Sequence, residues 1–180
     1  DLDDPQAFRR ALEWLAAEKC SGRVLGWHDR SDGGLIVAAL EMAFAARLGL
    51  QLEVAAIGGE AGSAPQQADA LTELFNEELG VLIEVADDAA DALRASAAGL
   101  GVTLRRIGAA RADGRLRVVA AGGRPDPSAP TLLLDADMGE LISAWGETSW
   151  RIQRERDDAD SADQEYRRLG DYAAPGLVYA

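Results

Sequence analysis

The side chains best suited to chemistry lie together in one short polar turn, from His28 to Gly34. The turn follows an apolar run typical of a strand and precedes a long apolar run typical of a helix. The free N–H groups and positive dipole end of a helix that starts there attract phosphate. Asp29 could supply a carboxylate to Mg²⁺, which commonly takes one or two carboxylates with phosphates and waters. Ser31 could bind a phosphate or a sugar.

A second interpretation of the same turn is purely structural. Ser31 or Asp32 could cap the following helix, which is the commoner role of such residues at a helix start. The turn also lacks the Gly-Lys-Ser/Thr ending of a Walker A loop, so it is not that kind of phosphate site. Residue types alone therefore leave ligand binding and helix capping both open.

Cysteine and histidine are too scarce for several kinds of chemistry. The chain holds one Cys (Cys20) and one His (His28), whereas a structural zinc site needs about four N or S ligands. A disulfide framework is impossible, which fits a reducing compartment. We interpret His28 as a half-buried residue at a strand end rather than a general acid or base or a nucleotide contact. A Cys20–His28 dyad is conceivable, but Cys20 lies at a helix end and no third group would orient the pair.

A second polar cluster comprises Asn76, Glu77 and Glu78. These side chains could coordinate a metal or orient a substrate. Such residues also commonly end a helix, and Gly80 would then be the residue that follows the helix C-cap. Both interpretations stay open.

The end of the chain carries aromatic and basic residues on a predicted helix. Trp145 and Trp150 are expected to pack rather than to stack on a ligand. Arg151, Arg154 and Arg156 are expected to form a solvated helix end, or to dock another part of a larger protein.

Composition limits the class of protein. The chain has 180 residues, a formal net charge of −13 and 48% apolar residues, so it is expected to form one domain with an extension, not a disordered chain. The acidic balance argues against binding a nucleic-acid backbone. No apolar run approaches the roughly 18 residues that span a bilayer. No signal peptide is recognisable, and the start at Asp1 without Met suggests a fragment.

Periodicity predicts alternating helices and strands, and therefore a mixed sheet flanked by helices. The order resembles a split βαβ, ferredoxin-like unit with additions. Helices are expected from Pro5 to about Gly22 and over 35–48, 66–78, 87–99 and 137–156. Strands are expected over 23–27, 50–54, 80–85, 103–110 and 115–121, the last two joined as a hairpin by Asp113-Gly114, with a short apolar run over 131–134. Loops are expected over 58–65 and 122–130, and residues past Asp157 are expected to be polar and irregular.

Three motifs, in order, resemble a known family. The run from His28 to Leu35, continuing through Ala39–Ala45, is similar to the carboxy-terminal domain of the aminoimidazole-ribotide-synthase-like superfamily, and Leu74–Gly80 agrees. The tail segments Thr148–Arg154, Ala162–Tyr166 and Pro175–Leu177 narrow the resemblance to large single-chain phosphoribosylformylglycinamidine synthases. They resemble the second synthase-type C-terminal domain (1–156) and the linker or docking tail toward a glutaminase domain (157–180).

The resemblance implies an α+β synthase-superfamily domain within an ATP-dependent C–N ligase of purine biosynthesis. Such an enzyme converts formylglycinamide ribonucleotide, glutamine and ATP to formylglycinamidine ribonucleotide, glutamate, ADP and phosphate. It implies that Asp29 is a Mg²⁺ ligand and that Ser31 contacts the ATP or ADP nucleotide, and it implies no catalytic residue here. The implied partners are a synthase-type N-terminal domain and the glutaminase domain of the same chain, in the cytoplasm.

Two alternatives accompany this expectation. The first is a non-catalytic scaffold that holds a structural Mg-ADP, because the second half of such enzymes carries a nucleotide that is not turned over. The second is the C-terminal domain of another superfamily member, such as a selenophosphate synthetase or a thiamine-monophosphate kinase. The isolated synthase fragment is expected to be inactive, since no glutaminase Cys and His occur in a matching context and the synthase-type N-terminal domain is missing.

Overall fold

The computed structural model describes residues 4–55, 67–121 and 131–174. The chain divides into two compact units, each built from two separate stretches of sequence. Unit 1 comprises Asp1–Met42 with Phe75–Ile107, and unit 2 comprises Ala43–Leu74 with Gly108–Ala180. No helix in the described part of the chain is both long enough and apolar enough to span a membrane.

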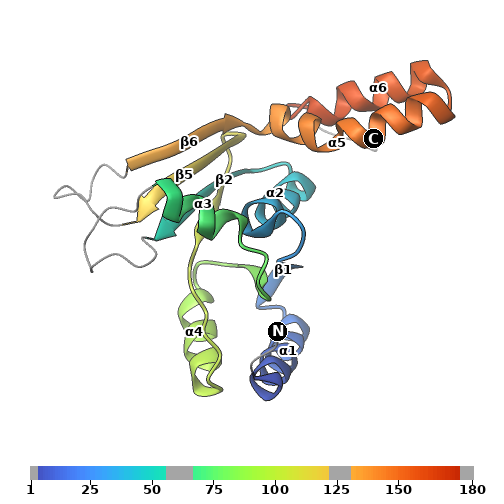
Figure 1. Ribbon diagram of the computed structural model, residues 1–180. Helices are drawn as coiled ribbons and strands as arrows, with labels where there is room; N and C mark the ends of the chain where they lie inside the picture. Colours follow the sequence, from blue (N-terminus) through green and yellow to red (C-terminus); the bar gives the residue numbers. More distant parts are fainter. Residues whose placement is uncertain (1–3, 56–66, 122–130, 175–180) are drawn as a thin grey trace. The chain divides into compact units, whose positions relative to one another are not determined.

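Unit 1 is a two-stranded antiparallel sheet with helices packed against it (Figure 1). Its first helix begins where the sequence predicts, because the side chain of Asp4 accepts hydrogen bonds from the N–H groups of Gln6 and Ala7. The two predicted strands pair with each other, and an irregularity between Val24 and Gly26 shifts their register. The elements are α1 (Pro5–Cys20), β1 (Val24–Asp29), α2 (Gly34–Ala46, which runs into unit 2), β3 (Val81–Val85) and α4 (Ala90–Gly99).

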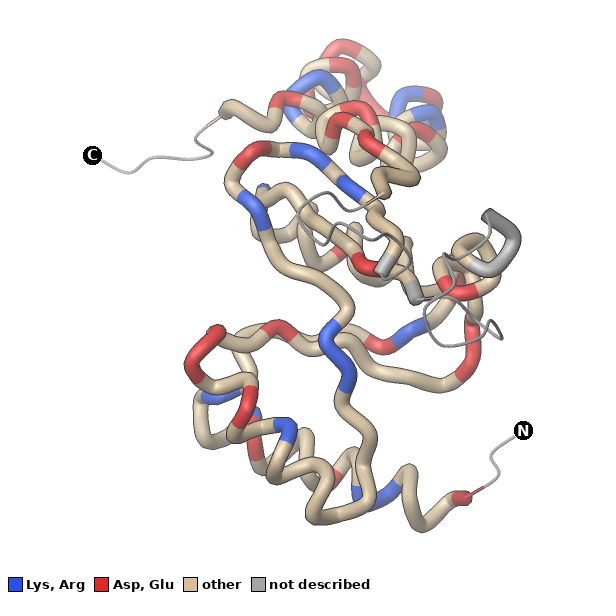
Figure 2. The backbone as a smooth tube through the Cα atoms, turned by 90° about the vertical axis from the view of Figure 1, so that its left-hand side faces the viewer, with Lys and Arg blue, Asp and Glu red and all other residues tan. Residues whose placement is uncertain are grey.

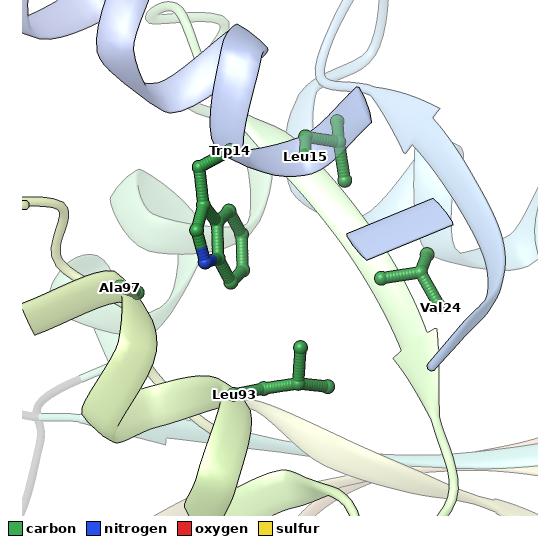
Figure 3. Close-up of a cluster of buried hydrophobic side chains, with 5 residues drawn as sticks. All are labelled: Trp14, Leu15, Val24, Leu93 and Ala97. Atoms are coloured by element: carbon green, nitrogen blue, oxygen red, sulfur yellow. The ribbon is translucent and has the colours of Figure 1, made fainter. Parts of the chain in front are cut away.

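The core of unit 1 forms where α1 and α4 meet the strands. Figure 3 shows its buried side chains, which come from α1, β1 and α4: Trp14, Leu15, Val24, Leu93 and Ala97.

A chain of polar contacts borders this core. The indole Nε1 of Trp14 donates to Ser96 Oγ at 2.9 Å, and that hydroxyl donates to Glu18 Oε1 at 3.1 Å. Arg23 pairs with the other oxygen of the Glu18 carboxylate at 2.6 Å. The buried carboxylate is therefore both hydrogen-bonded and paired, which offsets the cost of removing it from water.

Unit 2 contains a four-stranded mixed sheet in the order β4-β2-β5-β6. β2 and β5 are parallel, and the two outer pairings are antiparallel. This confirms the predicted mixed sheet with flanking helices. The elements are β2 (Gly49–Ala55), α3 (Gln67–Phe75), β4 (Gly108–Arg111), β5 (Arg115–Ala121), β6 (Thr131–Asp137), α5 (Met138–Arg156) and α6 (Ala159–Gly170).

The predicted hairpin between residues 103–110 and 115–121 is wrong. β4 and β5 both pair with β2, on its two sides, so their short connection crosses the start of β2 instead of forming a hairpin turn. Residues 103–107 lie outside any strand. The crossing is tight, because a Cβ at Gly49 would lie 2.8 Å from both the backbone N and O of Arg115. Asp113-Gly114 correctly predicts that the chain reverses direction there. No local pattern shows that β2 lies between the two strands that this reversal joins.

The predicted irregular tail is also wrong between residues 159 and 170, which form α6. α5 and α6 lie side by side (Figure 1). Tyr166 stacks on Trp150 with ring centroids 4.4 Å apart, and the indole of Trp150 donates to Asp163 at 2.9 Å. Gly146 leaves the space that Leu169 fills, because a Cβ there would lie 2.5 Å from a Leu169 methyl group.

The C-terminal end of α6 is held by Arg47. Its guanidinium donates to the backbone oxygens of Leu169, at 3.0 Å, and of Asp171. It also lies 5.1 Å from the ring centre of Tyr172, whose hydroxyl donates to backbone oxygens near the end of α2. Burial raises the pKa of Tyr172. The described residues after α5, up to residue 174, are therefore an integral part of unit 2.

Other boundaries differ slightly from expectation. α3 ends at Phe75 rather than at Glu78, and α4 begins at Ala90 rather than at Asp87. The predicted loops over 58–65 and 122–130 lie outside the described residues.

Arginines and aspartates form ion pairs beside the connection from β4 to β5 in unit 2. The Asp113 carboxylate accepts from Arg111 and Arg117 at 2.8 and 2.6 Å, and Asp135 pairs with Arg115 at 2.5 Å. These hydrogen bonds lower the pKa of Asp113 strongly, and the one from Arg115 lowers the pKa of Asp135. The groups are solvent-accessible, so water and salt screen each pair.

We expect these ion pairs to make unit 2 sensitive to acid. Because the folded-state pKa of Asp113 is below its ordinary value of 3.8, its contribution to stability is present above about pH 4 and is lost as the pH falls further. Asp113→Asn should lower the free energy of unfolding at pH 7 and flatten its decline between about pH 5 and 2. Urea unfolding across that range tests this, with the exposed Asp88→Asn as the control. Parallel pH curves for wild type and Asp113→Asn would contradict it.

We expect Leu93→Ala to destabilise unit 1 by about 2–5 kcal/mol, because a fully buried leucine leaves a cavity when truncated. Leu93 is 0% exposed, whereas Leu12 on α1 is 43% exposed. Leu12→Ala is therefore the matched control and should cost much less. Urea unfolding of both variants measures the difference, and equal losses would contradict the assignment of Leu93 to the core.

Candidate functional site

The polar turn of unit 1 joins the end of β1 to the start of α2. Two consecutive glycines make it possible, since Gly33 and Gly34 have φ of +82° and +73°, which L side chains rarely adopt. A Cβ at Gly33 would also lie 2.4 Å from Val37 Cγ2, so no side chain fits there. The N–H of Gly34 donates to the Ser31 carbonyl at 2.9 Å and closes the turn.

The structure brings the second polar cluster against this turn. The backbone N–H of Arg30 donates to the Gly80 carbonyl at 2.8 Å, next to the last pair of the β1–β3 ladder. The N–H of Gly33 donates to Glu77 Oε1 at 2.8 Å. Two motifs that lie 44 residues apart in sequence therefore form one site, which neither motif predicts alone.

These contacts decide between several sequence interpretations. Gly80 is not the residue that ends a helix, because α3 has already ended at Phe75. Within the described part of the chain, the side chains of Ser31 and Asp32 form no hydrogen bond, so neither caps α2. Glu77, from a different segment, holds the amide at that position instead.

Asp29 and Ser31 are both exposed on the turn. The side chain of Asp29 is 69% exposed, and its carboxylate lies 3.6 Å from Nδ1 of His28. The backbone carbonyl of Ser31 is used within the turn, whereas its hydroxyl is exposed. Both oxygens that the sequence singles out are therefore accessible to a ligand.

His28 lies half-buried at the end of β1, as the sequence suggests. Its Nδ1 is 2.6 Å from the Asp29 carbonyl oxygen, and its Nε2 is 3.1 Å from Glu41 Oε2. Both ring nitrogens thus face oxygen atoms, which leaves neither for the Cys20 thiol at the end of α1. The Glu41 contact was missed from sequence, where the only signal was one carboxylate inside an otherwise apolar helix.

The predicted metal site rests on the carboxylate of Asp29. Among the described residues, no group of three or more His, Cys, Asp or Glu side chains is arranged to hold a metal ion. Asp29 alone still fits Mg²⁺, because that ion commonly takes one or two carboxylates and completes its shell with phosphate oxygens and water. Asp29 would be the protein ligand and Ser31 a phosphate or sugar contact.

The aromatic and basic residues of α5 pack and pair as expected. Trp145 lies 6.0 Å from Phe44 between ring centres, and Trp150 stacks on Tyr166. Arg154 pairs with Asp163 at 2.9 Å. Figure 2 shows basic and acidic positions interleaved along the chain. These arginines therefore form local ion pairs, not a separate basic surface.

The fold is similar to that of solved structures from Thermotoga maritima. PurL complexed with ATP has a TM-score of 0.60 and 17% identity, over 78% of this chain and 22% of that chain. PurL complexed with FGAR has a TM-score of 0.58 and 18% identity, over 77% and 21%. PurLQS has a TM-score of 0.58 and 17% identity, over 77% and 22%. The chain thus spans about a fifth of the length of these proteins, and the likeness concerns the fold.

The family assignment rests on a separate comparison. Residues 1–121 match the family model described as AIR synthase related protein, C-terminal domain. The match covers both candidate motifs and more than half of the chain. The resemblance expected from the His28–Leu35 run is thus confirmed at the level of the superfamily, and the chain belongs to the AIR synthase related, C-terminal domain family.

Proposed function

We propose that the chain contributes Mg-nucleotide contacts to an ATP-dependent phosphoribosylformylglycinamidine synthase of purine biosynthesis. The observation that carries this proposal is the His28–Gly34 turn, which exposes Asp29 and Ser31 while its backbone is fixed from both sides. Proteins of similar fold have been solved with ATP, with ADP and with FGAR. They support a nucleotide as the ligand and the formylglycinamide ribonucleotide as the substrate of the complete enzyme.

The proposed division of work follows from the chemistry of the turn. Asp29 holds Mg²⁺, which neutralises phosphate charge when bound, and Ser31 contacts a phosphate or the sugar. The acidic chain, with a net charge of −13, would otherwise repel a nucleotide. Asp29 and Ser31 bind and orient the nucleotide, and the synthase-type N-terminal domain of a longer chain supplies most remaining contacts.

The position within a longer protein is part of the same proposal. The tail motifs favour the large single-chain form, with residues 1–156 as its second synthase-type C-terminal domain. Residues 157–180 then lead toward a glutaminase domain that releases ammonia, in the cytoplasm. The packing of α6 against α5 supports a connection that is docked over residues 159–170.

A scaffold role is the second candidate. The same two side chains would hold a Mg-ADP that is never turned over, and the exposed carboxylate of Asp29 suits that role equally. The two roles differ in what the loss of the ligand would change: turnover in the first case, thermal stability in the second.

Asp29→Asn in the complete enzyme separates the two roles. We expect Mg-ADP affinity to fall about tenfold or more, because the variant loses the charge that holds the metal. Loss of turnover with an unchanged melting temperature supports a catalytic site, and a lower melting temperature with turnover retained supports the scaffold. Asp32→Asn is the control, because Asp32 is another exposed aspartate of the same turn. Unchanged Mg-ADP affinity in Asp29→Asn would overturn the site assignment.

We further expect the 180-residue chain to be inactive by itself. These 180 residues match only the C-terminal domain family, and the exposed side chains of Asp29 and Ser31 do not by themselves hold the reacting phosphates in place. Incubation with formylglycinamide ribonucleotide, Mg-ATP and ammonia should give no amidine above the uncatalysed background. Turnover by the isolated chain would contradict this.

A further inference from the structure

The segment Asn76–Gly80, here called the 76–80 segment, has no regular secondary structure of its own. It lies between α3 and β3, and the side chains of Glu77, Glu78 and Leu79 are exposed. Internally it is fixed by one contact, in which the Glu78 N–H donates to Asn76 Oδ1 at 2.7 Å. Within the described residues, its other hydrogen bonds all go to the His28–Gly34 turn, so the segment and the turn support each other.

Arg30 makes the first set of contacts between the turn and the 76–80 segment. Its Nε donates to the Glu78 carbonyl at 2.5 Å, its Nη2 lies 3.4 Å from the Leu79 carbonyl, and its own N–H donates to the Gly80 carbonyl. Three successive carbonyls of the 76–80 segment thus face one residue of the turn. A flexible lysine amine could not reproduce this planar fork.

Gly80 provides the space for this arrangement. A Cβ at that position would lie 3.3 Å from both Cζ and Nε of Arg30, tighter than most real Cβ contacts. The guanidinium therefore lies directly against the backbone of the segment. The function of Gly80 is to admit Arg30, which accounts for a glycine that ends no helix.

Glu77 makes the second contact between the 76–80 segment and the turn. Its carboxylate accepts the Gly33 N–H at 2.8 Å, just before α2 begins. A carboxylate is favoured there because the amide belongs to the positive end of a helix. Arg30 donates from the turn to the segment, and Glu77 accepts from the turn through the opposite end of the segment. In sequence, Ser31 lies between the two anchored residues, Arg30 and Gly33, and Asp29 immediately precedes Arg30.

We infer that Arg30 and Glu77 are positioning residues that hold the Asp29–Gly34 turn in the conformation that presents Asp29 and Ser31 to a Mg-nucleotide. The inference rests on the proposed function for the identity of the ligand. The bracing of the turn itself rests only on the contacts described above. Neither residue needs to touch the nucleotide.

The bracing is tested first, without any ligand, by amide hydrogen exchange over residues 30–35 of the complete protein. Glu77→Ala removes the acceptor of the Gly33 amide and should speed its exchange about tenfold, whereas Glu77→Gln keeps an acceptor oxygen and should stay near wild type. Glu78→Ala is the matched control, because that neighbouring carboxylate is exposed and accepts no hydrogen bond among the described residues. Arg30→Gln should also speed exchange, and Arg30→Lys should restore little of the protection.

The same variants are then titrated with Mg-ADP by calorimetry. Glu77→Ala and Arg30→Gln should raise the dissociation constant about tenfold, with the melting temperature of the free protein unchanged. Glu77→Gln and Glu78→Ala should bind within about twofold of wild type. A merely structural role of the pair would lower the melting temperature of all disruptive variants and leave the affinity of the folded fraction unchanged.

The outcomes separate this inference from the proposed function. If the wild-type protein binds no Mg-ADP, the proposed function fails, and hydrogen exchange alone decides whether the pair braces the turn. Unchanged exchange in Glu77→Ala and Arg30→Gln overturns the inference even where Mg-ADP binds. Faster exchange with unchanged Mg-ADP affinity also overturns it, because the brace would then not serve the ligand.

Discussion

The amide of Gly33 is a demanding group to accommodate, and the candidate site depends on how it is satisfied. A residue with a side chain is excluded at position 33, because the backbone φ there is positive and a Cβ would collide with Val37. The N–H of Gly33 lies at the start of α2, where backbone amides have no acceptor within the helix, so it needs an acceptor from elsewhere. Glu77 provides that acceptor. One backbone hydrogen bond thereby ties the position of the turn to that of a segment far along the chain.

Similar long-range ties stabilise each unit. The buried carboxylate of Glu18 joins α1 to α4 through Ser96 and to the start of β1 through Arg23. In unit 2, Arg47 joins the end of α2 to the end of α6. In each case a charged side chain is buried or partly buried and is met by polar partners, which limits the cost of its desolvation. These contacts specify which elements pack together, and the apolar cores supply most of the stability.

The sequence predicts most of the helices and strands, but it does not predict which strands pair with each other. Local signals located α1 and α5, because Asp4 and Asp137 are true N-caps, and α2, because its apolar run is too long for a strand. They failed at β4 and β5, where the partner strand comes from another part of the chain. They also missed α6, although Ala162, Tyr166 and Leu169 have helical spacing. The many charges of that segment obscured this pattern.

The candidate site shows the same limit. The His28–Gly34 turn and the cluster at Asn76 were each found from residue types, and so were Asp29 and Ser31 as accessible oxygens. Their juxtaposition was not predictable, because it depends on the pairing of β1 with β3. Glu41 was overlooked for the same reason, since only the fold places it beside His28.

The crossing at Gly49 has a consequence for biosynthesis. β2 pairs with strands that lie about 60 residues later in the sequence, as the contact of Gln51 with Arg111 illustrates. A ribosome therefore releases β2, with Leu52 and Val54, well before its partners exist. Closing so long a loop is slow compared with local helix formation. β2 therefore does not have both of its partner strands until residue 121 has been synthesised, so its sheet forms only after most of this chain exists.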